Sequence, residues 1–381
     1  MRQAPPLRQA TIIPSLIPYT TIDDLTLLER LSDGFRDKTE VFRKKIAASF
    51  LDWITAEGNG SGNGAFDHLA EPYVAGHSLS EGLESIAEFQ DHGLKSTVDI
   101  LGEAARTKDD ADRYLDGYLS ILGPIKDRGL DASVSVKPSA ICAVEMDVNG
   151  KLILGSDNGA KFIDSTPLLP RLEQLVNQAK IKGINVTIDM EDHNYTDITL
   201  RAARELWTKG YDNFGIVLQA RLDRTREDVS RVLKLATYTV PMEKIRVRAV
   251  LGIYDEPNTI GCGKSEGKKR FVSMVDDLFE SGVYVEIATH DWNVIEEIKS
   301  MIDRKKVRKD RYEFQFLRGV NSSYKLSTKL VKGGEIVRFY QPVELEAGDG
   351  KEYMKRRLKA NPAFLYYGAK NFIQQLVSPA K

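Results

Sequence analysis

The sequence has 381 residues, of which 54 are Lys or Arg and 55 are Asp or Glu, so its formal net charge is −1. This balance gives the whole chain no general attraction to nucleic acid or to an anionic membrane surface. Hydrophobic residues make up 42% and charged residues 29%, which is enough apolar side chain for a sizeable core. The composition therefore excludes a mainly disordered protein.

The two cysteines, Cys142 and Cys262, lie far apart and show no C-x-x-C spacing. A disulfide framework and a cysteine-rich metal site are therefore not expected, and a reducing compartment fits. The longest uncharged stretch, residues 9–22, has 14 residues and contains two prolines. A membrane-spanning helix needs about 20 apolar residues. We expect a cytoplasmic protein.

The first 90 residues are expected to form a helical arm. Residues 22–55 carry apolar side chains among charges in a helical pattern, and residues 79–90 indicate a second helix. Between them, four glycines in the seven residues 58–64 indicate a flexible linker. We therefore predict two parts, an arm over residues 1–90 and a catalytic domain over residues 91–381.

From residue 96 onward, short β-branched runs alternate with amphipathic stretches, which is typical of repeated βα units and a parallel sheet. The expected strands are 97–101, 132–137, 185–189, 215–219, 245–250, 283–288, 312–317 and 335–340. The expected helices are 109–122, 168–182, 198–209, 226–235, 267–280, 292–302 and 351–376. This pattern predicts an α/β fold, a (β/α)8 TIM-type barrel. A doubly wound open sheet is the runner-up, but no G-x-G-x-x-G follows the first strand.

Active sites of such barrels lie at the carboxyl ends of the strands. The residues at or near those ends are Lys137, Asp189, Gln219, Arg248, Thr289, His290, Arg318 and Tyr340. Strand ends meet solvent and are often polar for that reason alone. Solvent exposure explains one or two polar strand ends easily, but it explains a polar residue at nearly every strand end less easily. The strand bodies are expected to be largely apolar. We therefore predict a polar functional site at this rim.

The last expected helix carries adjacent arginines, Arg356 and Arg357. Neighbouring helical residues point about 100° apart, so the pair could flank one anion. A guanidinium fork matches the two oxygens of a carboxylate. A basic pair on a terminal helix is more often a solvated face, and only its place beside the cationic rim favours binding.

Two further patterns resemble ligand sites but fail on geometry. The run 189–193 is rich in Asp, Glu and His, yet consecutive residues that leave a strand point in alternating directions and rarely share one ion. The run 261–265 ends like a phosphate loop, but position 258, where the first glycine is required, is Asn258. No metal site is expected.

Taken in order, the motifs resemble those of the proline dehydrogenase family, flavoenzymes that oxidise L-proline in a barrel of this kind. The matching segments are 99–104, 135–138, 188–192, 217–220, 248–257, 288–290, 314–317 and 353–358. The resemblance implies FAD as cofactor and conversion of L-proline to Δ1-pyrroline-5-carboxylate, with hydride transfer from C5 to the flavin N5. It also implies a quinone as the electron acceptor.

The resemblance implies a substrate pocket with a carboxylate clamp. Arg356, Arg357 and Lys137 would bind the proline carboxylate, and Tyr340 and Tyr353 would line the pocket around the ring.

Two acidic residues complete the site that the resemblance implies. Asp189 would keep the cations oriented and charge-balanced, and Glu103 would pair with the first arginine of the helix as a gate. The residues expected to act in catalysis are Asp189, Arg248 and Lys137.

The cofactor contacts follow from the same resemblance. They are Met190, Gln219, Arg248, Leu251, Gly252, Ile253, Thr289 and His290. Where the family commonly has Arg-x-Val-Lys-Gly-Ala-Tyr, this chain has Leu251 in place of the lysine. The contacts of this loop therefore depart from the family pattern.

Several alternatives stay open at this point. Another FAD-dependent barrel oxidoreductase, a hydroxyproline dehydrogenase or an NAD(P)H-using reductase, shares much of the pattern, although the bulk of Tyr340 would crowd a 4-hydroxyl group. A barrel without catalysis, whose arm mediates assembly, is a third reading. A nucleic-acid partner is not expected, while peripheral contact with the inner face of the membrane and the oligomeric state are left open.

Overall fold

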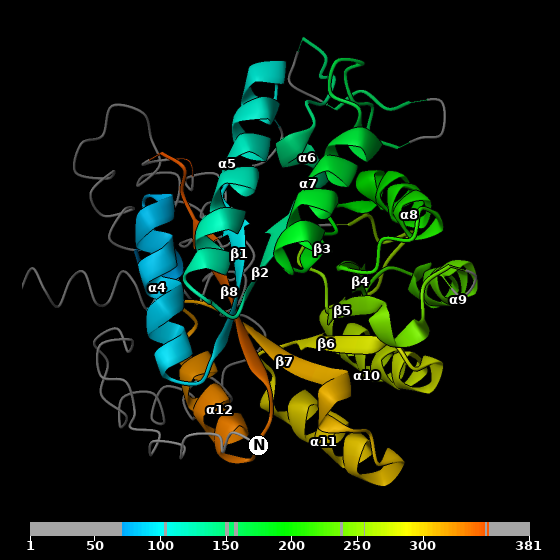
Figure 1. Cartoon of the computed structure of the whole chain (residues 1–381). Helices are drawn as coiled ribbons and strands as arrows, with labels where there is room; N and C mark the ends of the chain where they lie inside the picture. The colour runs from blue at the N-terminus through cyan, green and yellow to red at the C-terminus, as the bar shows by residue number, and fades with distance from the viewer. Residues whose placement is uncertain are drawn as a thin grey trace, which may run out of the picture.

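Eight parallel strands close into a barrel in the computed structural model (Figure 1). Each strand pairs with the next in sequence, and β8 pairs with β1. The strands are β1 Lys95–Ile100, β2 Ala132–Val136, β3 Val186–Ile188, β4 Phe214–Gln219, β5 Arg246–Val250, β6 Tyr284–Ala288, β7 Tyr312–Leu317 and β8 Val337–Val343. The predicted (β/α)8 barrel is confirmed, and all eight expected strands are present within a few residues of their predicted bounds.

The structure describes residues 71–102, 105–148, 152–155, 159–236, 239–254, 256–346 and 349. The expected helices 22–55 and 351–376 and the linker 58–64 lie outside these residues. The boundary predicted at residue 90 stays a prediction, because most of the arm before it, residues 1–70, lies outside the described residues.

Helices follow the strands and surround the barrel (Figure 1). They are α4 Leu79–Asp91, α5 Lys108–Asp127, α6 Pro138–Ile141, α7 Leu168–Lys182, α8 His193–Thr208, α9 Thr225–Ala236, α10 Lys264–Ser281, α11 Trp292–Lys305 and α12 Asn321–Lys332, with 3-10 turns at Glu71–Tyr73, Met242–Lys244 and Lys309–Arg311. Helix α12 was not predicted, because five of its 12 residues are Asn, Ser or Thr, which favour caps and turns over helix interiors. In the described part of the chain, no helix is long and apolar enough to cross a membrane.

Helix α4 packs against the barrel beside β1 and β8. Ser78 caps its first turn by accepting a hydrogen bond from the backbone of Glu81. Its buried face includes Ile86 and Phe89, which belong to the main core. Gly82 permits the close approach, since a Cβ there would lie 2.6 Å from Cγ2 of Val343 on β8.

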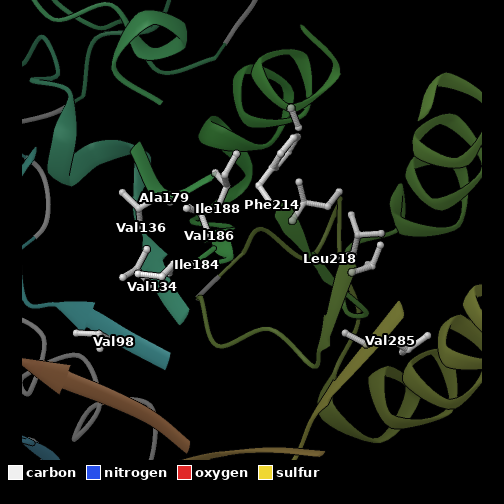
Figure 2. Close-up of a cluster of buried hydrophobic side chains, with 14 of the residues drawn as sticks. Val98, Val134, Val136, Ala179, Ile184, Val186, Ile188, Phe214, Leu218 and Val285 are labelled. Carbon is white, nitrogen blue, oxygen red and sulfur yellow. The ribbon is translucent and has the colours of Figure 1, made fainter. Parts of the chain in front are cut away.

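The main hydrophobic core lies between the strands and the helices. Alternate strand residues face outward, and Figure 2 shows Val98, Val134, Val136, Val186 and Ile188 together with side chains from β4, β6 and α7. Because neighbouring side chains of a strand point to opposite faces, this arrangement assigns the other half of each strand to the barrel interior.

The interior of the barrel is polar and charged. The expectation of largely apolar strand bodies is wrong for β5 to β8, where polar or ionisable residues occupy alternate positions. These residues are Arg246 and Arg248 on β5, Tyr284 and Glu286 on β6, Glu313 and Gln315 on β7, and Arg338 and Tyr340 on β8. Barrels of this class usually fill their interior with Val, Ile and Leu, so the charges here need partners.

Candidate active site at the carboxyl ends of the strands

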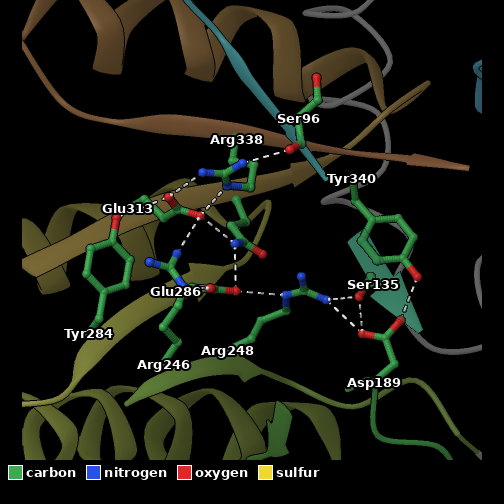
Figure 3. Close-up of polar contacts among 11 residues, drawn as sticks. Ser96, Ser135, Asp189, Arg246, Arg248, Tyr284, Glu286, Glu313, Arg338 and Tyr340 are labelled. Atoms are coloured by element: carbon green, nitrogen blue, oxygen red, sulfur yellow. Dashed lines mark hydrogen bonds and ion pairs between the residues drawn. The ribbon is translucent and has the colours of Figure 1, made fainter. Parts of the chain in front are cut away.

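Asp189, directly after β3, accepts hydrogen bonds from three other strands. Its Oδ1 accepts from Ser135 Oγ at 2.8 Å and from Arg248 Nη1 at 2.7 Å, and its Oδ2 accepts from Tyr340 OH at 2.7 Å (Figure 3). β5 and β8 are not neighbours of β3 in the closed barrel, so Arg248 and Tyr340 reach Asp189 across the interior. The carboxylate therefore joins residues from β2, β5 and β8 at one end of the barrel.

Lys137 forms a buried ion pair with Asp99. Its Nζ lies 2.5 Å and 2.6 Å from the two carboxylate oxygens, and the Asp99 side chain is fully buried. Tyr118 OH lies 3.4 Å from Asp99 Oδ1. Burial raises the pKa of Asp99 and outweighs the lowering effect of Lys137. Lys137 is also 3.4 Å from Tyr340 OH, which links this pair to Asp189.

Arg248 is held on two of its three nitrogens. Nη1 donates to Asp189 and, at 2.9 Å, to Ser135 Oγ, and Nε donates to Glu286 Oε2 at 3.3 Å. Burial alone would lower the pKa of the guanidinium, but Asp189 and Glu286 outweigh burial and raise it. Arg248 is therefore fully charged.

The third nitrogen of Arg248, Nη2, is buried and has no hydrogen-bond partner among the residues that the structure describes. Leaving a buried donor unpaired costs free energy, so such a group calls for an acceptor that these residues do not supply. The flavin ring carries nitrogen and oxygen acceptors of this kind. The donor set at this end of the barrel thus fits the cofactor expected from the sequence.

Gln219 and Gly252 form a close contact between the ends of β4 and β5. Gln219 Nε2 donates to the backbone oxygen of Glu191 at 2.7 Å, which fixes the side chain. Gly252 has φ +97°, and a Cβ there would lie 3.0 Å from Gln219 Oε1. Only glycine combines this backbone conformation with this approach.

Thr289 and His290 follow β6 at the same rim. Thr289 Oγ1 accepts a hydrogen bond from the backbone of Asp291 at 3.2 Å. His290 Nε2 accepts from the backbone of Leu317 at 3.0 Å. Since Nε2 must carry a lone pair to accept, this contact assigns a neutral imidazole with its proton on Nδ1.

The other expected cofactor contacts are placed less centrally. Leu251 packs against helix α10, where a Cβ added to Gly267 would lie 3.0 Å from Leu251 Cδ1. Ile253 is 48% exposed, and Met190 is buried after β3. The chain thus has an apolar contact with α10 at the position where the family commonly has a lysine.

Four of the expected site residues lie outside the described part of the chain. They are Glu103, Tyr353, Arg356 and Arg357. Several residues of the network were not predicted as site candidates, namely Asp99, Tyr118, Ser135 and Glu286. The signal for Asp99 and Glu286 is an acidic residue with an apolar neighbour on each side within a strand, and Ser135 precedes Lys137 by one strand period.

The side chains of the acidic run after β3 diverge. Asp189 faces the barrel interior, Glu191 contacts Ser139, and His193 Nδ1 lies 2.6 Å from Glu256 Oε2. Among the residues that the structure describes, no group of three or more His, Cys, Asp or Glu is arranged to hold a metal ion.

Glu191 is a fully buried carboxyl at this rim. It accepts hydrogen bonds from the backbone nitrogen of Ser139, at 2.9 Å, and from Ser139 Oγ. Burial raises its pKa to about 7, and the hydrogen bonds from Ser139 offset only part of that effect. The native protein therefore binds this proton more tightly than the unfolded chain does.

We expect Glu191 to make stability fall as the pH rises. Its stabilising effect is complete below the ordinary pKa of 4.5 and is lost as the pH rises through about 7. The loss amounts to about 3 kcal/mol at alkaline pH. Glu191→Gln, which stays neutral, should flatten the dependence of urea unfolding on pH, whereas Glu227→Gln on the exposed surface should keep the wild-type slope. Equal slopes in all three proteins would contradict the assignment.

Comparison with known proteins places this geometry in context. A family model described as proline dehydrogenase matches residues 82–365. The proline dehydrogenase of Deinococcus radiodurans is 28% identical over 306 residues, which cover 79% of this chain and 90% of that protein. Proline dehydrogenase 1 of Bacillus subtilis strain 168 is 25% identical over 307 residues, which cover 80% of this chain and 91% of that protein.

A solved structure shares the fold. Proline utilization A from Bdellovibrio bacteriovorus, inactivated by N-propargylglycine, aligns with a TM-score of 0.70 at 24% identity. The alignment covers 85% of this chain and 37% of the larger protein. At this identity the likeness shows the barrel alone.

Proposed function

The chain belongs to the proline dehydrogenase family, and we propose that it oxidises L-proline to Δ1-pyrroline-5-carboxylate with bound FAD. The observation that carries the proposal is the convergence of Lys137, Asp189, Arg248 and Tyr340 at one end of the barrel. All four residues lie within residues 82–365, which match the family model, and their contacts span four strands.

The cofactor would bind along the ends of β3 to β6. Arg248 offers the Nη2 donor, which has no partner among the described residues, and Gln219 and Gly252 bring two strand ends close together. Thr289 and His290 follow the next strand, where the backbone of Leu317 holds the imidazole of His290. FAD supplies the redox chemistry, acceptance of a hydride from the substrate carbon, and the protein supplies orientation and charge.

The substrate would bind through its carboxylate. Lys137 is one cation of the clamp, and Arg356 and Arg357 supply the others by the resemblance. Tyr340, with Tyr353, would line the ring. Cations close to the bound amine lower its pKa, and the neutral amine has the lone pair that assists loss of hydride.

Asp189 and Glu103 would act on the other site residues rather than on proline. Asp189 fixes the Tyr340 hydroxyl and the Arg248 guanidinium through its two oxygens. Glu103, by the resemblance, would pair with Arg356 and close the pocket against water.

We also propose a quinone as the electron acceptor and a cytoplasmic location, with peripheral contact at the inner face of the membrane. The quinone follows from the resemblance to bacterial family members, and the cytoplasmic location follows from the two distant cysteines, which fit a reducing compartment. A quinone that accepts the electrons resides in a membrane, so peripheral contact would bring the reduced enzyme to its acceptor.

An anaerobic absorbance titration of the purified protein with L-proline tests the function. We expect loss of the flavin band at roughly 450 nm, with no loss on addition of NADH. The same titration with trans-4-hydroxy-L-proline should give little bleaching, because Tyr340 crowds the 4-hydroxyl. Bleaching by NADH alone would favour an NAD(P)H-using reductase. Bleaching by hydroxyproline alone would favour a hydroxyproline dehydrogenase. A colourless protein that takes up no FAD would favour a barrel without catalysis.

A further inference from the structure

A second charged layer lies in the barrel interior beneath the candidate site. Glu286 Oε1 accepts from Arg246 Nε at 2.8 Å, and its Oε2 accepts from Gln315 Nε2 at 2.8 Å and from Arg248 Nε at 3.3 Å (Figure 3). Glu286 thus joins this layer to Arg248, which belongs to the site above it.

The layer continues to Glu313 and Arg338. Arg338 Nε donates to Glu313 Oε1 at 2.6 Å, and Arg246 Nη2 lies 3.6 Å from the same oxygen. Arg338 Nη1 donates to the backbone oxygen of Ser96 at 2.7 Å. Burial would raise the pKa of Glu313, but Arg338 and Arg246 outweigh burial and lower it to about 2. Glu313 is therefore a fixed negative charge, but none of its hydrogen bonds or ion pairs here joins it directly to Arg248.

The position of Arg248 follows from these contacts. A guanidinium is planar, so fixing Nε and Nη1 also fixes the direction of Nη2. Asp189 and Ser135 fix Nη1, and Glu286 fixes Nε. Glu286 is in turn fixed by Arg246 and Gln315, so it cannot turn away from Arg248 without breaking other bonds.

Among the residues that the structure describes, the charges of the interior network balance. The cations are Lys137, Arg246, Arg248 and Arg338, and the carboxylates are Asp99, Asp189, Glu286 and Glu313, four of each. Neutralising Glu286 would leave this set with one net positive charge beside Arg248. In the protein interior, where the dielectric constant is low, this positive charge would strongly stabilise a nearby group that gains negative charge.

We propose that Glu286 is a positioning residue for Arg248. Glu286 holds the Nη2 group of Arg248 in place for the bound flavin, and the negative charge of Glu286 lowers the potential at which that flavin is reduced. This inference rests on the proposed function, because it requires FAD beside Arg248. The hydrogen bonds of Glu286 go to Arg246, Arg248 and Gln315, and the proposal gives it two separable effects, on the position of Arg248 and on the charge around the flavin.

The test compares three variants with the wild-type holoenzyme. Glu286→Gln removes the charge, Glu286→Asp keeps the charge but shortens the reach to Arg248, and Glu313→Gln removes an equally buried charge from the same layer. The readouts are the midpoint potential of the bound flavin and the dissociation constant of FAD, from titration of the apoprotein.

We expect Glu286→Gln to shift the midpoint potential to a more positive value, since the reduced flavin tends to be anionic and would gain net positive surroundings. Glu286→Asp should keep the wild-type potential and raise the FAD dissociation constant about tenfold, because Arg248 is less well fixed. Glu313→Gln should change both readouts much less, although it should lower thermal stability.

Equal potential shifts in Glu286→Gln and Glu313→Gln would overturn the inference, because the effect would then be one of general charge. An unchanged or more negative potential in Glu286→Gln would overturn it as well. If Glu286→Gln does not fold, Glu286→Asp decides, and a wild-type FAD affinity in that variant overturns the positioning role. A wild-type protein that binds FAD but is not bleached by proline contradicts the proposed function while leaving these readouts measurable.

Discussion

Replacing Lys137 with methionine is expected to lower the free energy of unfolding by about 3–5 kcal/mol, the usual cost of removing one partner of a buried ion pair. The Asp99 carboxylate is fully buried, and Lys137 Nζ contacts both of its oxygens. Tyr118 OH, at 3.4 Å, is too distant and too weak a donor to replace that cation. Urea unfolding of the apoprotein at neutral pH measures the loss.

The double variant Lys137→Met/Asp99→Leu is the control for this prediction. Because both charges are removed together, it should recover most of the lost stability while remaining inactive with proline. If the losses of stability in Lys137→Met and in Asp99→Leu simply added in the double variant, the ion pair would be contradicted. Full activity of Lys137→Met would contradict the role of Lys137 in binding the substrate. The two outcomes are independent, so stability and function can be judged separately.

The barrel could be predicted because its outward-facing residues carry a strong local signal. Val134 and Val136 on β2, and Val186 and Ile188 on β3, pack against helices and must be apolar. β-branched residues at these positions favour a strand regardless of what the interior contains. Helix α12 lacks such a signal, since its sequence is rich in Ser, Thr and Asn, which have low helix propensity.

The charged interior could not be predicted from single strands. Arg246 and Glu286 are isolated polar residues in the sequence, and only the register between β5 and β6 places Arg248 opposite Glu286. The contact between Asp189 and Tyr340 joins residues 151 positions apart across the interior. Strand spacing shows that alternate residues share a face, but it does not show which strands meet.

The strand-end rule placed Lys137, Asp189, Arg248 and Tyr340 at one rim, and the family resemblance added a role for each. The structure brings these four residues into one connected network. Neither the rule nor the resemblance gave a role to Ser135, which donates to Asp189 and accepts from Arg248. A small hydroxyl residue carries little signal in sequence, because serine is common in exposed strands and loops.

Replacing Asp189 with alanine is expected to lower kcat/KM for L-proline by about a hundredfold to a few thousandfold. Three donors lose their acceptor at once, and Arg248 and Tyr340 lose the group that joins them across the barrel. Breaking such a buried charged contact costs about 3–5 kcal/mol, and about 1.4 kcal/mol corresponds to a factor of ten in rate. Steady-state kinetics with an artificial electron acceptor measure the effect.

Asp192→Asn is the matched control, three residues along the same segment. Asp192 caps helix α8 by accepting from the backbone of Asn194 at 2.9 Å, and asparagine caps a helix about as well as aspartate. We therefore expect wild-type kinetics from Asp192→Asn. Activity of Asp189→Ala within threefold of wild type would show that Arg248 and Tyr340 keep their positions without the carboxylate. Equal losses in both variants would point instead to a disturbed segment after β3.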